Sequence, residues 1–199
     1  VEESAEKAAD CFRRSADLGY PDALYRLGLC YAYGHGVQRD DKKATDLFRQ
    51  GAEAGHAPSI CQLGLCYEAG RGVPEDIHKA AELYEQSGRL GYPEAQCNLG
   101  VLYRYGVGIS QDRDKAAIFF SQAAERNFPR AQFFLGLHYE YGEGVEKDPA
   151  RAAELYAKAA EQNFPEAVRA LAVCCENGIG VEKDIQRAVT LYRRAVDLG

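Results

Sequence analysis

The chain has 199 residues, of which 27% are charged, and its formal net charge at pH 7 is −6. Acidic and basic residues are mixed throughout it, which argues against a nucleic-acid-binding protein, because such proteins carry a clustered basic stripe. No apolar run approaches the roughly 20 residues of a membrane-spanning helix, so direct membrane insertion is not expected. The chain lacks Met and begins with Val1. We therefore expect it to be a piece of a longer protein.

Residues 2–18 predict a single helix. Ala8, Cys11 and Phe12 recur on one face at helical spacing. Ser4 stands where it can cap the first turn by accepting a backbone N–H. Gly19 ends the helix, because glycine adopts the left-handed conformation that commonly follows a helix.

Five copies of a 36-residue pattern follow this helix. The first copy contains the run Leu27-Gly28-Leu29-Cys30-Tyr31-Ala32-Tyr33-Gly34-His35-Gly36-Val37, and its leading glycine returns as Gly64, Gly100 and Gly136, with Ala172 in the fifth copy. Repeats of this length indicate a stacked solenoid. We predict one repeat domain, residues 1–199, made of the second helix of a truncated repeat (1–19) and five full repeats (20–55, 56–91, 92–127, 128–163 and 164–199).

Each full repeat is predicted to contain two helices, here called helix A and helix B. Helix A begins near a proline in four repeats and ends at the first glycine of a Gly-x-Gly loop. Helix B begins after an aspartate that caps it (Asp40, Asp76, Asp112, Asp148 and Asp184) and ends at Gly55, Gly91, Asn127, Asn163 or Gly199. The fold class is therefore all-α, a solenoid of helix-turn-helix repeats with eleven helices and no strand.

Helical geometry divides helix A into two faces. One face contains the leading glycine, which lacks a Cβ and lets a facing helix approach closely. Positions on the other face vary among Tyr, Phe, Arg and Glu, and such variation within a regular frame suggests recognition. Their competing interpretation is a solvated surface whose tyrosines only cover their neighbours. An aliphatic position beside them (Leu29, Leu65, Val101, Leu137 and Val173) is interpreted first as packing between repeats.

Charged residues recur at one position of this second face, as Glu68, Arg104, Glu140 and Glu176. We interpret them as solvated charges and expect Arg104 to pair with Glu68 or Glu140. Across the whole face, six acidic residues (Asp22, Glu68, Glu94, Glu140, Glu166 and Glu176) outnumber three basic ones (Arg104, Arg130 and Arg169). A ligand with some positive charge is mildly favoured.

Catalytic and metal sites are not predicted. The Gly-x-Gly pairs lack the third glycine and the preceding strand of a phosphate-binding loop. His35, His56, His78 and His138 occupy different structural roles and do not converge on a metal. No Ser or Cys has a His at a recognisable catalytic spacing. We therefore predict no catalytic residue, no metal and no cofactor.

The seven cysteines are interpreted as small buried apolar residues. Cys30, Cys66 and Cys174 share one repeat position, and Cys61 and Cys97 share another. Equivalent positions on stacked helices lie about 8–10 Å apart, whereas a disulfide needs Cα atoms within about 7 Å. A reducing cytoplasm is slightly favoured over a secreted or luminal location, although the compartment stays open.

The repeat frame resembles the Sel-one-like repeat family, a relative of the tetratricopeptide repeat. The fourth repeat carries the frame in Ala131, Leu135, Gly136, Tyr139, Gly142, Gly144, Val145, Asp148, Arg151, Ala152, Leu155, Tyr156, Ala159 and Ala160. The resemblance implies a right-handed α-superhelix that acts as an adaptor between proteins. One cysteine-rich bacterial branch has been linked to β-lactam binding. Its disulfide pattern is absent here, because its first cysteine position is occupied by Ala16, Ala52, Gly88, Ala124 and Ala160.

The resemblance also places the variable face of helix A in a concave groove. We predict that this groove binds a protein or peptide ligand through Tyr25, Tyr33, Arg104, Tyr105, Phe133, Glu140, Tyr141 and Arg169. The leading hypothesis is a non-enzymatic scaffold or adaptor. The alternatives are a small-molecule (β-lactam-like) binder or weak hydrolase, and a purely structural spacer. The sequence does not identify the partner or the oligomeric state.

Overall fold

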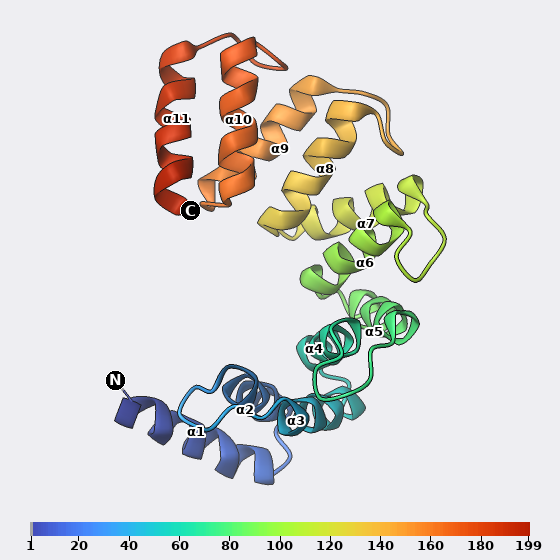
Figure 1. Ribbon diagram of the computed structural model, residues 1–199. Coiled ribbons are helices and arrows are strands. Elements are labelled where there is room, and N and C mark those ends of the chain that lie inside the picture. Colours follow the sequence, from blue (N-terminus) through green and yellow to red (C-terminus); the bar gives the residue numbers. More distant parts are fainter. Residues whose placement is uncertain (1) are drawn as a thin grey trace. The chain divides into compact units, whose positions relative to one another are not determined.

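The computed structural model describes residues 2–199, and this range contains eleven helices and no strand (Figure 1). Their bounds are α1 Glu2–Asp17, α2 Pro21–Tyr33, α3 Asp41–Glu53, α4 Ala57–Glu68, α5 Ile77–Arg89, α6 Pro93–Tyr105, α7 Arg113–Glu125, α8 Pro129–Tyr141, α9 Pro149–Glu161, α10 Pro165–Asn177 and α11 Ile185–Leu198. The all-α prediction is confirmed, including the start of helix A at a proline in four repeats.

The chain forms two compact units, one ending at Ala95 and the other beginning at Gln96. The first unit contains α1 to α5, and the second contains most of α6 and all of α7 to α11. From α1 to α5, and again from α7 to α11, each helix packs against the next one along the chain (Figure 1). Even-numbered helices are the A helices of the repeats, and odd-numbered helices from α3 onward are the B helices.

The capping aspartates hold both ends of the loop between helix A and helix B. Each carboxylate accepts a hydrogen bond of 2.9–3.0 Å from the backbone N–H three residues later. Each aspartate's own N–H donates to a helix A carbonyl nine residues earlier, as Asp148 does to Tyr139 at 2.8 Å. Hydrogen bonds from backbone N–H groups lower the pKa of Asp40 and Asp112. The predicted caps are therefore confirmed.

Two further expectations about helix ends have different outcomes. Asn127 and Asn163 adopt φ values of 60° and 61°, so asparagine fills the role of the terminal glycine as predicted. The predicted cap at Ser4 is wrong, because α1 already begins at Glu2 and Ser4 lies inside it. No proline or glycine precedes Ser4, so nothing in the sequence stops the helix from extending by these residues.

The leading glycines of helix A lie against aromatic rings of helix B in the same repeat. Gly28, Gly64, Gly100 and Gly136 face Phe48, Tyr84, Phe120 and Tyr156, and all four rings are buried. A Cβ on Gly136 would lie 2.5 Å from the ring of Tyr156, well inside van der Waals contact. This confirms the predicted close approach of the two helices. Six of the seven cysteines are also buried, whereas Cys11 is exposed.

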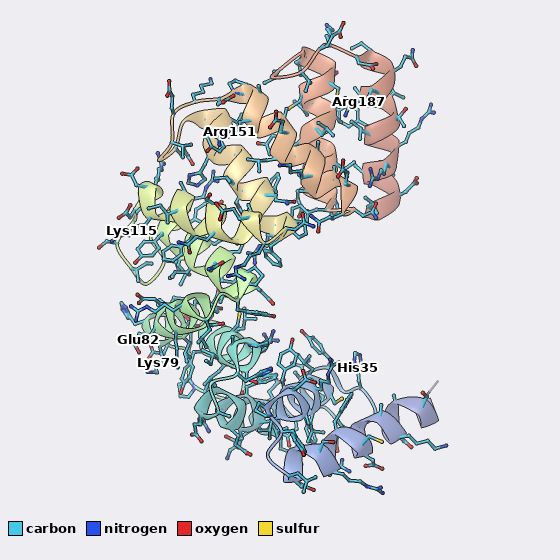
Figure 2. The ribbon with its side chains drawn as sticks, turned by 180° about the vertical axis from the view of Figure 1, so that it is seen from behind. His35, Lys79, Glu82, Lys115, Arg151 and Arg187 are labelled. Atoms are coloured by element: carbon cyan, nitrogen blue, oxygen red, sulfur yellow. The ribbon has the colours of Figure 1, made fainter. Side chains whose placement is uncertain are left out.

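In three repeats, the basic residue three positions after the capping aspartate lies against a tyrosine of helix A. The Arg151 guanidinium lies 4.9 Å from the ring centroid of Tyr139, and the ammonium groups of Lys43 and Lys115 lie 5.3 Å from Tyr31 and Tyr103. Figure 2 labels Lys79, Lys115, Arg151 and Arg187, the residues at this position from the second repeat onward. Cation–π contact accounts for the basic residue in these three repeats, whereas Arg187 has Cys175 at the tyrosine position.

Candidate functional site

Three repeats contain a hydrogen bond between a helix B tyrosine and a helix A glutamate sixteen residues earlier. The Tyr156 hydroxyl donates to Glu140 at 2.5 Å, and the Tyr192 hydroxyl donates to Glu176 at 2.6 Å. Tyr84 donates to Glu68 in the same way. Burial, reinforced by the neighbouring carboxylate, raises the pKa of Tyr84 and Tyr156 above the usual value for tyrosine. These glutamates therefore accept hydrogen bonds from their own repeats.

The two remaining full repeats replace both members of this pair. Phe48 and Phe120 occupy the tyrosine position, and Ala32 and Arg104 occupy the glutamate position. A buried phenyl ring has no hydroxyl to satisfy, so an acceptor is not needed opposite it. The glutamate therefore occurs only in the repeats that also have the tyrosine, as expected if its role is to accept the hydrogen bond of that hydroxyl.

Replacing Tyr156 with phenylalanine should lower the free energy of unfolding by about 1.5–3 kcal/mol, the usual range for a hydrogen bond to a charged group. The matched control is Tyr192→Phe, whose hydrogen bond to Glu176 lies at an exposed position and should matter less. Urea denaturation followed by circular dichroism measures both. Equal costs at the two positions would contradict the importance of burial.

Arg104 forms an ion pair with Glu143, in the loop between α8 and α9. Its Nη2 lies 3.1 Å from Glu143 Oε2, and Arg113 Nη2 lies 3.7 Å from Glu143 Oε1. The Arg104 side chain is 13% exposed and that of Glu143 is 20% exposed. The expected pairing of Arg104 with Glu68 or Glu140 is therefore wrong, because Glu140 is bonded to Tyr156 and the loop supplies a closer carboxylate.

A cleft of about 230 Å³ in the second unit brings four of the predicted groove residues together: Phe133, Glu140, Tyr141 and Arg169. They come from α8 and α10, the A helices of the fourth and fifth repeats. The cleft is also lined by Leu137, Glu166, Ala170, Val173, Cys174 and Ile179. Tyr141 is 61% exposed and Arg169 is exposed, whereas Phe133 packs on neighbouring rings, including Tyr156 at 5.8 Å. The cleft thus has an apolar lining with charged groups beside it.

The other four predicted residues lie outside this cleft. In the first unit, Tyr25 packs on Phe48 and His56, at ring-centroid distances of 6.3 and 5.6 Å. Tyr33 is exposed and stacks on His35. In the second unit, Tyr105 is 58% exposed, and the guanidinium of Arg104 lies 5.7 Å from its ring centroid.

Ile179 and Glu143 were not identified from the sequence. Both stand between the two glycines of a Gly-x-Gly loop, at the position also occupied by His35, Arg71 and Val107. The sequence did contain a signal for these two residues, because the residue type at this loop position differs in every repeat. The same kind of variation led to the prediction of the helix A residues as a recognition surface.

Within residues 2–199, no three His, Cys, Asp or Glu side chains gather closely enough to hold a metal ion. The same part of the chain contains no helix that is long and apolar enough to cross a membrane.

The Sel1 repeat family model matches six consecutive segments of the chain, residues 1–20, 21–56, 57–92, 93–128, 129–164 and 165–199. The chain belongs to the Sel1 repeat family. Sel1 repeat proteins are generally protein-interaction scaffolds, and the Sel1 repeat fold is typically non-enzymatic. A search of curated proteins found no match.

Solved structures of Sel1 repeat proteins are similar to this chain. One is c5321, a protective antigen with an SLR fold from uropathogenic Escherichia coli, at 34% identity and a TM-score of 0.84. The alignment covers 95% of this chain and 40% of c5321, so the chain spans less than half of that protein. A Sel1 repeat protein from Oxalobacter formigenes aligns at 31% identity and a TM-score of 0.83, over 91% of this chain and 72% of its own.

A third structure shows the fold alone. The immunity protein Pa5087 from Pseudomonas aeruginosa aligns at 20% identity and a TM-score of 0.67, over 96% of this chain and 73% of its own. These similarities and the helix arrangement together confirm the predicted solenoid class and the predicted family.

Proposed function

We propose that this Sel1 repeat chain is a non-enzymatic scaffold that binds an extended peptide segment of a partner protein in the cleft between α8 and α10. The observation that carries the proposal is the meeting of Phe133, Glu140, Tyr141 and Arg169, from two successive repeats, in one open cleft. A site built from two repeats selects a ligand that follows the stacking direction, as a peptide does.

The lining of the cleft indicates the chemistry of the segment. Leu137, Val173 and Ile179 supply aliphatic surface, which favours an apolar side chain of the peptide as the anchor. Glu166 and Arg169 are both exposed, and they offer the flanking peptide residues one charge of each sign. Tyr141 adds a large exposed ring with a polar end, a combination that is common among binding hot spots.

The carboxylates of the cleft region support binding rather than hydrolysis. Glu140 and Glu176 are the glutamates of the fourth and fifth repeats, and each accepts a hydrogen bond from a tyrosine of its own repeat. A general acid or base must instead reach the proton that it transfers. The recurrence of glutamate at this position is thus explained by the hydrogen bonds with these tyrosines.

The double substitution Tyr141→Ala/Arg169→Ala should abolish the binding of peptides selected from a displayed random library against the wild-type chain. Removal of two hot-spot side chains typically costs more than 2 kcal/mol, or about thirtyfold in affinity. Both side chains are exposed, so the helical circular dichroism should not change. Isothermal titration calorimetry measures the affinity.

The matched control is Tyr20→Ala, because the Tyr20 side chain is 61% exposed, as that of Tyr141 is, but precedes α2 in the first unit. It should leave the affinity unchanged. Selected peptides that still bind the double variant, or that lose affinity equally with Tyr20→Ala, would place binding elsewhere.

A further inference from the structure

Four residues of the second unit, each at a position that differs among the repeats, lie in one cluster. Arg104 replaces a glutamate, Phe120 replaces a tyrosine, and His138 stands where the other repeats have Cys30, Cys66, Leu102 and Cys174. Glu143 is the acidic member of the variable loop position. We call these four residues the Arg104 cluster. Independent substitutions in a repeat would scatter, so their meeting in one place suggests a shared role.

His138 is the buried centre of this cluster. Its side chain has no exposed surface, and its ring meets the ring of Phe120 edge-on at 5.3 Å between centroids. Nδ1 lies 2.5 Å from the backbone carbonyl oxygen of Glu143. A carbonyl only accepts, so Nδ1 carries the proton, and a neutral ring leaves Nε2 as a lone pair.

The surroundings of Nε2 tolerate a lone pair but not an added proton. Within the described residues, Nε2 is buried and has no hydrogen-bond partner. The charged groups that act on the ring are Arg104 from α6, Arg113 from the start of α7 and Glu143 from the loop. The Glu143 carboxylate is already shared between the two arginines. An imidazolium would therefore add a third positive charge beside one carboxylate and an N–H without an acceptor.

The α8–α9 loop, residues 142–148, is attached both to the preceding repeat and to its own helix. Arg104 of α6 holds the side chain of Glu143, and His138 of α8 holds its backbone. The neighbouring Gly144 lies directly against the carbonyl of Arg113 at the start of α7. Three elements of two repeats thus converge on this short loop.

We propose that the Arg104 cluster is a pH-sensitive latch, which holds the α8–α9 loop against α6 and α7 while His138 is neutral and releases it when His138 gains a proton. The imidazolium keeps its Nδ1–H, so the cost of protonation lies at Nε2, whose new N–H reaches water only if the loop moves. The latch does not rest on the proposed peptide site, and it sets how firmly the third and fourth repeats are joined.

The direction of the pH dependence follows from burial. Burial lowers the pKa of His138 below the ordinary value of 6.5, and the charges of Arg104 and Arg113 lower it further. The unfolded chain therefore binds this proton at a higher pH than the folded chain does. The stability of the closed loop is complete above about pH 6.5 and falls as the pH drops below that value.

Hydrogen–deuterium exchange of the α8–α9 loop at about pH 7.5 and about pH 5.3 tests the latch, after correction for intrinsic exchange rates. In the wild-type chain, the protection of these amides should fall about tenfold at the lower pH. His138→Leu, which introduces the residue that the third repeat has as Leu102, should remove the fall. The control His78→Gln alters an exposed histidine and should behave as the wild type does.

Unchanged protection in the wild type, or an equal fall in His138→Leu, would overturn the proposal. A second measurement covers the case in which His138→Leu does not fold. An NMR titration of the wild-type chain should show the His138 ring and the loop amides changing together, at a pH below 6.5. A ring that titrates while the loop amides stay unchanged would overturn the latch as well.

Discussion

Replacing Gly144 with alanine should lower the free energy of unfolding of the second unit by about 2–4 kcal/mol. Gly144 has a φ of 68°, a conformation that costs an L-residue about 1–2 kcal/mol. A Cβ there would also lie 2.3 Å from the carbonyl oxygen of Arg113. The clash is with backbone, which cannot rotate away as a flexible side chain does, so the overpacking cost adds to the conformational one.

The control for this substitution is Gly55→Ala. Gly55 has a similar φ of 75°, but no atom lies within 4 Å of the place where its Cβ would be. The control therefore reports the conformational cost alone, about 1–2 kcal/mol. Denaturant titration combined with hydrogen exchange near Arg113 measures both variants, because repeat arrays can unfold in steps. A loss at Gly144 no larger than at Gly55 would disprove the importance of the contact between the repeats.

The helices and their caps were predictable because their signals are local and repeated. The capping carboxylate of Asp148 and the left-handed asparagine at position 127 depend on their immediate neighbours, and five copies fix the register. The contact between Gly136 and Tyr156 was predictable for the same reason, since both recur at fixed spacing. Ser4 was misassigned because the first helix has no complete repeat around it from which to read its start.

The candidate site was less predictable, because side-chain partners depend on three-dimensional packing. The hydrogen bond from Tyr156 to Glu140 was visible in the sequence only as a joint change of two positions sixteen residues apart. The partner of Arg104 depends on a loop of the next repeat, so position on a helical wheel pointed to the wrong carboxylates. The packing of the Tyr25 ring on Phe48 and His56 was likewise not visible in the sequence, and its assignment to the groove stays a prediction.

Exchanging Arg104 for glutamate should be the most damaging change at the site, with a loss of about 3–5 kcal/mol in the free energy of unfolding. The substitution removes the ion pair and turns a carboxylate toward that of Glu143, where both side chains are largely buried. Phe120 cannot compensate, because its ring has no hydroxyl to donate. Arg104→Gln should cost less, since it removes the ion pair without adding a like charge.

Adding Phe120→Tyr to Arg104→Glu should recover about 1–2 kcal/mol, because the two changes together install the tyrosine–glutamate hydrogen bond of the fourth repeat. Phe120→Tyr alone should gain less, since the new hydroxyl would face Arg104, which donates hydrogen bonds but accepts none. Urea titrations of the two single variants and the double variant give the coupling energy. Costs that add within about 0.5 kcal/mol would show that the two positions do not interact.

The first repeat provides a comparison in which a loop arginine is present. Ala32 and Phe48 occupy the same two positions there, and Arg71, at the loop position of Glu143, lines the same pocket. The double variant Ala32→Glu/Phe48→Tyr should therefore be stabilising, because the new carboxylate has both a hydroxyl and Arg71 as partners, whereas the double variant of the third repeat should be less stable than the wild type. The difference between the two repeats measures what an arginine–glutamate pair contributes at this place, and a difference near zero would mean that the tyrosine–glutamate pair replaces the ion pair of Arg104 with Glu143 fully.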